Sequence, residues 1–378
     1  MIFAEGENYR ETRPLGIVGS VLRQMHLDGP LLLALIMVAS MGIFVLYSAS
    51  GQDSEIVVKQ AVRFGISLLT LFLVAQVPPH FLRLWAPWFY LLALLLLLSV
   101  LITGDIGKGA QRWLDLGFVR FQPSEIMKLA LPLVAAWYLH QRQLPPTLQS
   151  TLVVAVLVLV PTVLIGMQPD LGTALLIAAS GIIVILLAGM NLKLVAIAGA
   201  LGLALAPVMW SFMQDYQRTR VLTFLNPETD PLGAGYHIIQ SNIAIGSGGI
   251  FGKGWNNGTQ AQLDFLPERS TDFIFAVLGE EFGLLGILVL LGVYIFIIGR
   301  GILIAAQAPS TFSRLLAGAI SLTFFVYVFV NTGMVSGLLP VVGVPLPLFS
   351  YGGTSMVTLM AGFGILMSIQ TNRKLLST

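Results

Sequence analysis

Long apolar runs recur along the chain, separated by short breaks that contain charged residues, prolines or clustered glycines. A helix needs roughly 20 predominantly apolar residues to cross a hydrocarbon core about 30 Å thick. Ten runs of suitable length occur, at 30–50, 57–77, 86–103, 124–139, 152–167, 171–190, 192–213, 273–298, 315–339 and 348–369. The pattern therefore predicts an all-α polytopic membrane protein with ten transmembrane helices.

The composition agrees with a membrane protein and excludes several other classes. Of the 378 residues, 56% are hydrophobic and 10% are charged, whereas soluble domains typically carry about 25% charged residues. The formal net charge of +2 offers no basic surface, so no nucleic-acid partner is predicted. The absence of cysteine excludes disulfides and thiolate metal sites, and the four histidines have no metal-ligand spacing, so no metal site is predicted.

The distribution of charges predicts which side of the membrane each loop faces. Residues 1–28 lack the early apolar run of a cleaved signal peptide, so we expect a cytoplasmic N-terminal tail followed by a transmembrane domain at 29–378. With this orientation, the cytoplasmic loops after the tail carry basic residues but no Asp or Glu, as the positive-inside rule favours. An even number of helices then returns the C-terminus to the cytoplasm.

The longest loop, at 214–271 between the seventh and eighth predicted helices, is expected on the extracytoplasmic side, and loops this long are usually functional. Within it, 234–245 has apolar residues at helical spacing, which fits either a helix in the outer membrane interface or one packed on the bundle. The glycine run IGSGGIFGKGW follows. It is not a phosphate-binding loop, because Ser247 replaces a required glycine and Gly254 replaces a required Ser or Thr. A flexible turn or a re-entrant segment is expected instead.

Ionisable residues at membrane depth are costly, so they are usually paired or functional. Glu125 and Lys128 lie three residues apart on one face, near the start of the fourth predicted helix. A buried structural ion pair explains this spacing, but a pair that faces a water-filled cavity would also hold an anionic substrate. Asp170, in the break between the fifth and sixth predicted helices, fits an N-cap for the sixth.

More acidic residues surround the start of the eighth predicted helix. Asp272 has the position of a cap, although Ser270 and Thr271 would serve equally well, so capping alone does not require a carboxylate. Glu280 and Glu281 follow on different faces, and we expect at least one to pair with another helix. A carboxylate near outward-facing cations suits a base that removes a hydroxyl proton while cations hold a departing phosphate. Two carboxylates and a cation equally suit a proton-coupled transporter, so both classes stay open on composition.

These residues fall in stretches that are similar to a known family. The matching segments are LYSASGQD, KGAQRWLDLGFVRFQPSEIMKLA, QPDLGTALL, DPLGAGYHIIQSNIAIGSGGIFGKGW, QLDFLPERSTDFIFAVLGEEFGLLG and NTGMVSGLLPVVGVPLPLFSYGGTSM. In this order they resemble the SEDS family (shape, elongation, division and sporulation). The resemblance implies a ten-helix glycosyltransferase that polymerises lipid II into peptidoglycan strands at the outer face of the bacterial cytoplasmic membrane during cell elongation.

The resemblance also implies roles for individual residues. Asp272 matches the catalytic base, which would take the acceptor's hydroxyl proton while undecaprenyl diphosphate leaves in a single inverting displacement. The expected cavity and substrate-binding residues are Glu125, Lys128, Asp170, Arg112, Glu268, Arg269, Ser350, Tyr351, Gly352 and Gly353. Lys128, Arg112 and Arg269 are the candidate cations for the departing diphosphate. No cofactor is expected to be required, although a divalent cation is compatible with the chemistry.

The implied partners are lipid II, a class B penicillin-binding protein that supplies the transpeptidase, and other membrane proteins of the elongation complex. Two other functions remain to be weighed. A flippase for lipid II should offer ionisable groups to both leaflets, whereas the candidate groups here cluster outward. A purely scaffolding protein would leave Asp272, Glu125, Lys128 and Asp170 unexplained unless all of them are structural pairs.

Overall fold

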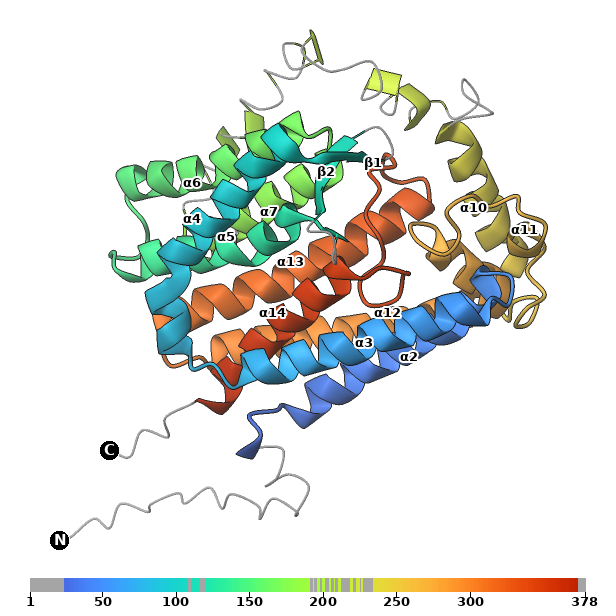
Figure 1. The fold of residues 1–378 in the computed structure, drawn as a ribbon, viewed down its shortest axis with the longest axis horizontal. Coiled ribbons are helices and arrows are strands. Elements are labelled where there is room, and N and C mark those ends of the chain that lie inside the picture. The colour runs from blue at the N-terminus through green and yellow to red at the C-terminus, as the bar shows by residue number, and fades with distance from the viewer. Residues whose placement is uncertain are drawn as a thin grey trace, which may run out of the picture.

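The computed structural model describes residues 24–372, apart from 108–109, 116–119 and most of 191–233. Long helices make up most of it (Figure 1). They are α2 (Gly29–Ala49), α3 (Ser54–Ala75), α4 (Pro79–Thr103), α5 (Pro123–His140), α6 (Leu148–Met167), α7 (Leu171–Leu187), α10 (Ala234–Gly248), α11 (Thr259–Gln262), α12 (Ile274–Ala306), α13 (Thr311–Val335) and α14 (Thr354–Thr371).

Seven helices in the described part of the chain are long and apolar enough to cross a membrane, namely α2, α3, α4, α6, α12, α13 and α14. Helix α7 is a shorter apolar helix, and α5 occupies the place of the fourth predicted span. The seventh predicted span, at 192–213, falls largely outside the described residues. The chain is therefore a multi-pass membrane protein, while the count of ten spans and the orientation stay predictions.

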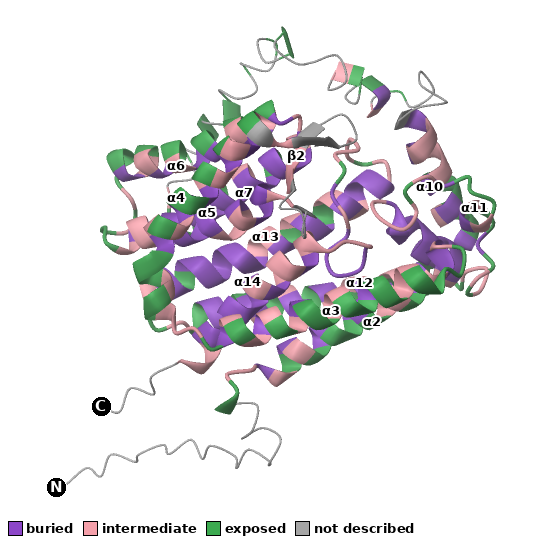
Figure 2. Cartoon of the chain, viewed as in Figure 1, coloured by how far each residue is buried: buried purple, intermediate pink, exposed green. Residues whose placement is uncertain are grey.

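Two groups of helices meet along α13. Helices α2, α3, α12 and α14 lie beside one another, α4 to α7 form the second group, and α13 contacts α5, α7, α12 and α14 (Figure 1). Buried positions concentrate on α5, α7, α13 and the inner faces of α12 and α14 (Figure 2). Large apolar side chains such as Leu33, Trp85, Trp88 and Ile295 are exposed on the outside, as expected where lipid replaces water.

Several helices begin at the polar residues that the sequence places between apolar runs. The side chain of Asp28 accepts a hydrogen bond from the Leu31 amide at 3.0 Å, and Thr147 caps α6 in the same way. Ser310 caps α13. Such caps satisfy amide groups that have no acceptor within the helix. Asp28 also holds Arg300 of α12 at 2.6 Å, which allows a cation near the end of an otherwise apolar helix.

A small antiparallel sheet interrupts the helical pattern and was not predicted. It comprises β1 (Asp105–Gly107), β2 (Ala110–Asp115) and β3 (Arg120–Phe121), in the order β1-β2-β3. This segment is too polar and too rich in glycine for a membrane helix, so its backbone groups pair between short strands instead. The sheet carries Arg112 to the polar centre of the molecule.

Helix α12 is broken at Gly283, where φ is 62° and ψ is −159°. The glycine run docks into this break. The amides of Lys253 and Gly254 donate to the carbonyls of Glu280 and Glu281, both at 3.0 Å, and the amides of Leu284 and Leu285 donate to the carbonyls of Gly249 and Ile250 at 2.9 and 3.1 Å. The run is thus a packed turn that satisfies the backbone of the broken helix.

The two buried glutamates beside this break have partners outside α12. Lys253 donates to Glu280 Oε1 at 2.8 Å. Ser48 of α2 donates to Glu281, which confirms that at least one of the pair contacts another helix. The helix predicted around 234–245 is α10, and it packs on the bundle, because Ser241 is buried and donates to the Val335 carbonyl at 2.8 Å.

Candidate functional site

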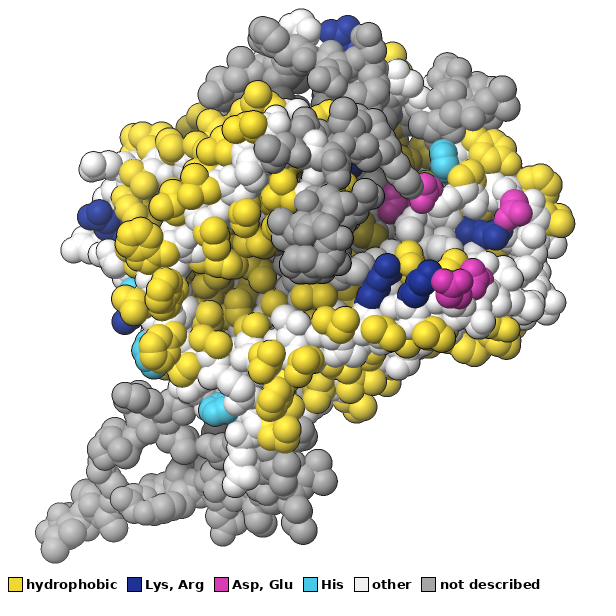
Figure 3. Space-filling view, in the orientation of Figure 1, with side chains coloured by type: hydrophobic (Ala, Val, Ile, Leu, Met, Phe, Trp, Pro, Cys, Tyr) yellow, Lys and Arg dark blue, Asp and Glu magenta, His cyan; other side chains and the backbone are white. Residues whose placement is uncertain are grey.

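A polar cavity of about 710 Å³ lies where α5, α7, α10, α13 and the starts of α12 and α14 converge. Nine of the predicted site residues line it, namely Arg112, Glu125, Lys128, Asp170, Glu268, Asp272, Tyr351, Gly352 and Gly353. Acidic and basic side chains gather on one part of the face drawn in Figure 3, while hydrophobic side chains cover much of the rest. The structure therefore brings together residues that lie up to 241 positions apart in sequence, from Arg112 to Gly353.

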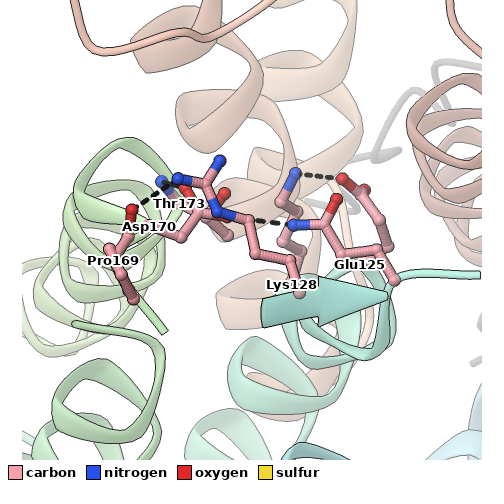
Figure 4. A network of polar contacts seen from close by, with 7 residues as sticks. Glu125, Lys128, Pro169, Asp170 and Thr173 are labelled. Atoms are coloured by element: carbon pink, nitrogen blue, oxygen red, sulfur yellow. Dashed lines mark hydrogen bonds and ion pairs between the residues drawn. The ribbon is translucent and has the colours of Figure 1, made fainter. Parts of the chain in front are cut away.

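Glu125 and Lys128 form a nearly buried ion pair on the first turns of α5. Lys128 Nζ donates to Glu125 Oε1 at 2.7 Å, and the two side chains are 11% and 8% exposed (Figure 4). Lys128 also stands 5.1 Å from the ring centroid of Tyr327. The predicted pair is confirmed, and it faces the cavity. Its charges are thus paired within the protein and accessible to a bound molecule.

Asp170 combines capping with a place in the cavity wall. Its Oδ1 accepts from the Thr173 amide at 3.2 Å, so the predicted N-cap of α7 is confirmed. Its Oδ2 accepts from Gln122 at 2.9 Å and lies 3.8 Å from Nε of Arg112 (Figure 4). Arg112 in turn donates to the Pro169 carbonyl. Strand β2, α5 and α7 are tied together through this one carboxylate.

Asp272 lies just before α12, in a segment whose main-chain carbonyls accept hydrogen bonds from α13 and from the residues that precede α14. Three consecutive carbonyls accept hydrogen bonds: Ser270 from the Tyr351 amide at 2.9 Å, Thr271 from the Ser350 hydroxyl at 2.5 Å, and Asp272 from Asn331 at 3.0 Å. We call these three bonds the Asp272 strap. They fix the main chain that carries the carboxylate.

The side chain of Asp272 faces the cavity. No side chain caps α12, so this carboxylate is not its N-cap. A Cβ added to Gly343 would lie 3.6 Å from Asp272 Oδ2, and both residues border the cavity. Gly343 has a φ of 73°, a backbone conformation that favours glycine, and because it has no side chain it leaves space beside the carboxylate.

His237 is a cavity residue that the sequence did not identify. It stands on α10 with its ring stacked on Phe273 at 5.5 Å. Burial lowers the pKa of His237 below its usual value of 6.5, against the opposing negative charge of Glu268. The ring is therefore neutral at pH 7. Its segment, AGYHIIQS, was noted as a helix and within a stretch that matches the family, but without a role for the histidine.

Other polar residues of the wall were also missed, because hydroxyls and amides inside apolar runs give no charge signal. They are Gln122, Thr173, Tyr327, Thr354 and Ser355. Asn331 is fully buried and bonds both the Asp272 carbonyl and the Val344 carbonyl, the latter at 2.7 Å. The sequence sign that could have identified Asn331 was an asparagine inside an apolar run, because a buried amide needs hydrogen-bond partners.

Two predicted residues do not border this cavity. Arg269 pairs with Asp264 and donates to the Ala261 carbonyl, in a neighbouring hollow of about 320 Å³. Ser350 is buried, and it accepts from the Leu346 amide at 2.8 Å while it donates to Thr271. Ser350 thus holds the strap, and Arg269 lies beside the cavity rather than in its wall.

Metal binding has little support among the residues that the structure describes. No group of three or more His, Asp or Glu there has the arrangement of a metal site. The paired acids have other partners, since Glu125 binds Lys128 and Asp170 binds Gln122 and Thr173. The independence from metals and cofactors stays a prediction. The cavity offers a positioned carboxylate together with cations that are each shared with an acid.

Known proteins with similar sequences share almost the whole length of this chain. The family model described as "Cell cycle protein" (FTSW_RODA_SPOVE) matches residues 24–375. The chain is 55% identical to "Peptidoglycan glycosyltransferase MrdB" of Escherichia coli K12. The match extends over 355 residues and covers 94% of this chain and 96% of that protein.

Solved structures agree with the sequence matches. A chain in the structure described as "Structural coordination of polymerization and crosslinking by a peptidoglycan synthase complex" has a TM-score of 0.81 and 35% identity, covering 92% of this chain and 98% of that one. The rod shape determining protein RodA of Thermus thermophilus has a TM-score of 0.70 and 30% identity, covering 92% and 97%. Because the family model spans nearly the entire sequence, the chain belongs to the SEDS family of membrane proteins, the family of FtsW, RodA and SpoVE.

Proposed function

We propose that this protein is a peptidoglycan glycosyltransferase that polymerises lipid II at the outer face of the bacterial cytoplasmic membrane during cell elongation. The observation that carries the proposal is the strapped Asp272, whose carboxylate borders the same cavity as the Glu125–Lys128 and Asp170–Arg112 pairs. The printed name of the 55% identical E. coli protein supports the reaction class.

In the proposed reaction Asp272 is the general base. It takes the proton from the 4-hydroxyl of the acceptor's N-acetylglucosamine as that oxygen attacks the anomeric carbon of the donor's N-acetylmuramic acid. The new C–O bond forms as the bond to the diphosphate breaks, and its electron pair leaves on undecaprenyl diphosphate. One displacement inverts the anomeric configuration and needs no covalent nucleophile. Lys128 and Arg112 stabilise the developing charge.

The geometry of the cavity floor supports an enzyme over a flippase. Among the described residues, a small extension of about 30 Å³ adjoins the cavity at Lys128 and shares Glu125 and Tyr327 with it. Leu129, Pro132 and Phe324 border this extension. A space of that size holds about one water molecule, far less than a disaccharide. A flippase needs a polar route of substrate width towards the other leaflet.

A transpeptidase partner follows from the same proposal. A structural relative belongs to a complex that coordinates polymerization with crosslinking. We propose that a class B penicillin-binding protein and other membrane proteins of the elongation complex bind this chain, with lipid II as the substrate.

The test is polymer formation from lipid II by the purified chain and by Asp272→Asn and Asp272→Ala. A positioned base contributes about 10²–10⁴-fold, so both variants should lose at least about 100-fold of the rate. Because Asp272 caps no helix, the nearly isosteric Asp272→Asn should keep the unfolding temperature of the unmodified chain. Full polymerisation by a folded Asp272→Asn protein would remove Asp272 as the base. Lipid II translocation in liposomes without any polymerisation would support the flippase.

A further inference from the structure

The first turn of α14 opens into the cavity. Thr354 and Ser355 line it together with the preceding Gly352 and Gly353. No side chain caps this helix. The first amides of any helix lack acceptors inside the helix and form the positive end of its dipole. A Cβ added to Gly352 would meet nothing within 4 Å, so there is space beside this turn for a bound group, while the Gly352 amide itself donates to Gln60 Oε1 at 3.3 Å.

Arg63 of α3 stands beside this turn. Its guanidinium carbon lies 4.4 Å from the ring centroid of Tyr351, and a Cβ on Gly353 would lie 3.4 Å from its Nε. In the described part of the chain, no carboxylate lies within ion-pair distance of Arg63, whereas Lys128 is held by Glu125 and Arg112 lies near Asp170. Arg63 therefore brings to the cavity rim a positive charge that no described acid offsets.

A third, independent observation comes from the deep side of the cavity. Tyr327 of α13 is 3% exposed, and its hydroxyl, which interacts electrostatically with Lys128, forms no direct hydrogen bond to a described residue. Tyr327 lines the cavity, and with Thr358 and Gly362 of α14 it also lines the narrow extension. An unsatisfied buried hydroxyl costs about 1–3 kcal/mol. Its position indicates a polar ligand group between α13 and the start of α14.

We propose that the N-terminal turn of α14, with Arg63 and Tyr327, is a binding site for a diphosphate ester. This assignment rests on the proposed function, in which the donor carries a diphosphate. Helix N-termini bind phosphate through their free amides, and guanidinium forms paired hydrogen bonds with phosphate oxygens. The charges of Lys128 and Arg112 are partly neutralised by their acidic partners. The α14 turn and Arg63 thus supply donors that are free to bind the leaving group.

The first experiment measures binding of farnesyl diphosphate to the purified chain in detergent by calorimetry, with farnesol as the uncharged analogue. Arg63→Gln should weaken diphosphate binding at least about tenfold, because a charge-assisted contact is lost, and it should leave farnesol binding unchanged. Tyr327→Phe removes a single hydroxyl and should weaken diphosphate binding several-fold. The control is Arg83→Gln. Arg83 contacts His140 at 3.0 Å near the start of α4. That end of the bundle is remote from the first turn of α14, since Ser368, near the end of α14, bonds Val77 just before α4.

A second arm separates two sources of phosphate chemistry. Phosphatidylglycerol in the same micelles should fail to displace farnesyl diphosphate, because a site for a diphosphate prefers two phosphoryl groups to one. Efficient displacement would instead make the turn a general anionic headgroup site. Equal diphosphate affinity in the unmodified chain and Arg63→Gln would overturn the proposal.

Binding and polymerisation, measured in parallel, keep this inference apart from the proposed function. If the unmodified chain polymerises lipid II and Arg63→Gln binds farnesyl diphosphate normally, the site assignment fails and the proposed function stands. If the chain binds farnesyl diphosphate through Arg63 but never polymerises lipid II, the function fails and the diphosphate site stands.

Discussion

The break in α12 makes a quantitative prediction for Gly283→Ala. The glycine occupies a backbone region that is essentially closed to other residues, which costs about 1–3 kcal/mol. The added Cβ would also lie 2.6 Å from the Ile250 carbonyl oxygen. Forcing a methyl group into such a space costs about another 1–3 kcal/mol, and undocking of the glycine run would release four main-chain hydrogen bonds.

Together these effects predict that Gly283→Ala lowers the free energy of unfolding by about 2–6 kcal/mol. Gly292→Ala is the matched control, because it lies on the same helix and its Cβ would meet nothing within 4 Å. Alanine in a helix interior is favoured over glycine by up to about 1 kcal/mol, so the control should be as stable as the unmodified chain or more so.

The assay is the apparent unfolding temperature in detergent at one fixed heating rate, since unfolding of such proteins is often irreversible. Gly283→Ala should unfold at least about 5 °C below Gly292→Ala, given a few degrees per kcal/mol. Equal unfolding temperatures for the two variants would show that the glycine run does not depend on the break. The reasoning about the packed turn would then be refuted.

Three further predictions test the orientation, the ion pair and the buried histidine. Single cysteines at Asn256 and Thr259 should react from outside with a membrane-impermeant thiol reagent, and labelling only after permeabilisation would contradict the assigned orientation. The double variant Glu125→Leu, Lys128→Met should stay folded and membrane-inserted, because exchanging a buried ion pair for apolar residues of similar volume is often neutral. It should nevertheless lose polymerisation, and retained polymerisation would make the pair purely structural. The pKa of His237 is lowered in the folded protein, so the unfolded chain binds its proton first and stability should fall as pH drops below about 6.5. His237→Gln should flatten that part of the profile measured by thermal unfolding, and an unchanged profile would exclude His237 as its source.

The apolar runs predicted most helices to within a few residues, because lipid exposure demands continuous apolarity. The exceptions have physical reasons. Helix α4 begins at Pro79 rather than at the predicted 86, because its first turns carry polar residues, among them Arg83, which contacts His140. The last predicted helix began at 348, but α14 begins at Thr354, since the prolines of the PLPLF stretch keep a buried loop apolar without making it helical. Helix α12 extends to Ala306, beyond the predicted end at 298, because Arg300 is neutralised by Asp28.

The sequence located the charged site residues more readily than the neutral ones. Asp272, Glu125, Lys128 and Asp170 stand out as ionisable groups beside apolar runs, and all four line one cavity. Their convergence depends on contacts between distant helices, which spacing along the chain does not encode. Asn331 gave no such signal, because a single amide is easily accommodated in an apolar helix when tertiary contacts satisfy it.

The Asp272 strap has a consequence for the order in which the protein is made. Two of its three donors, the Ser350 hydroxyl and the Tyr351 amide, belong to residues synthesised well after Asp272 itself. They sit directly before α14, the last helix that the structure describes. A nascent chain that still lacks this region has its carboxylate but not the bonds that position it. We therefore expect the Asp272 carboxylate to be positioned only once α14 has joined the bundle, so a chain that stalls before α14 would carry this carboxylate without two of its three supporting bonds.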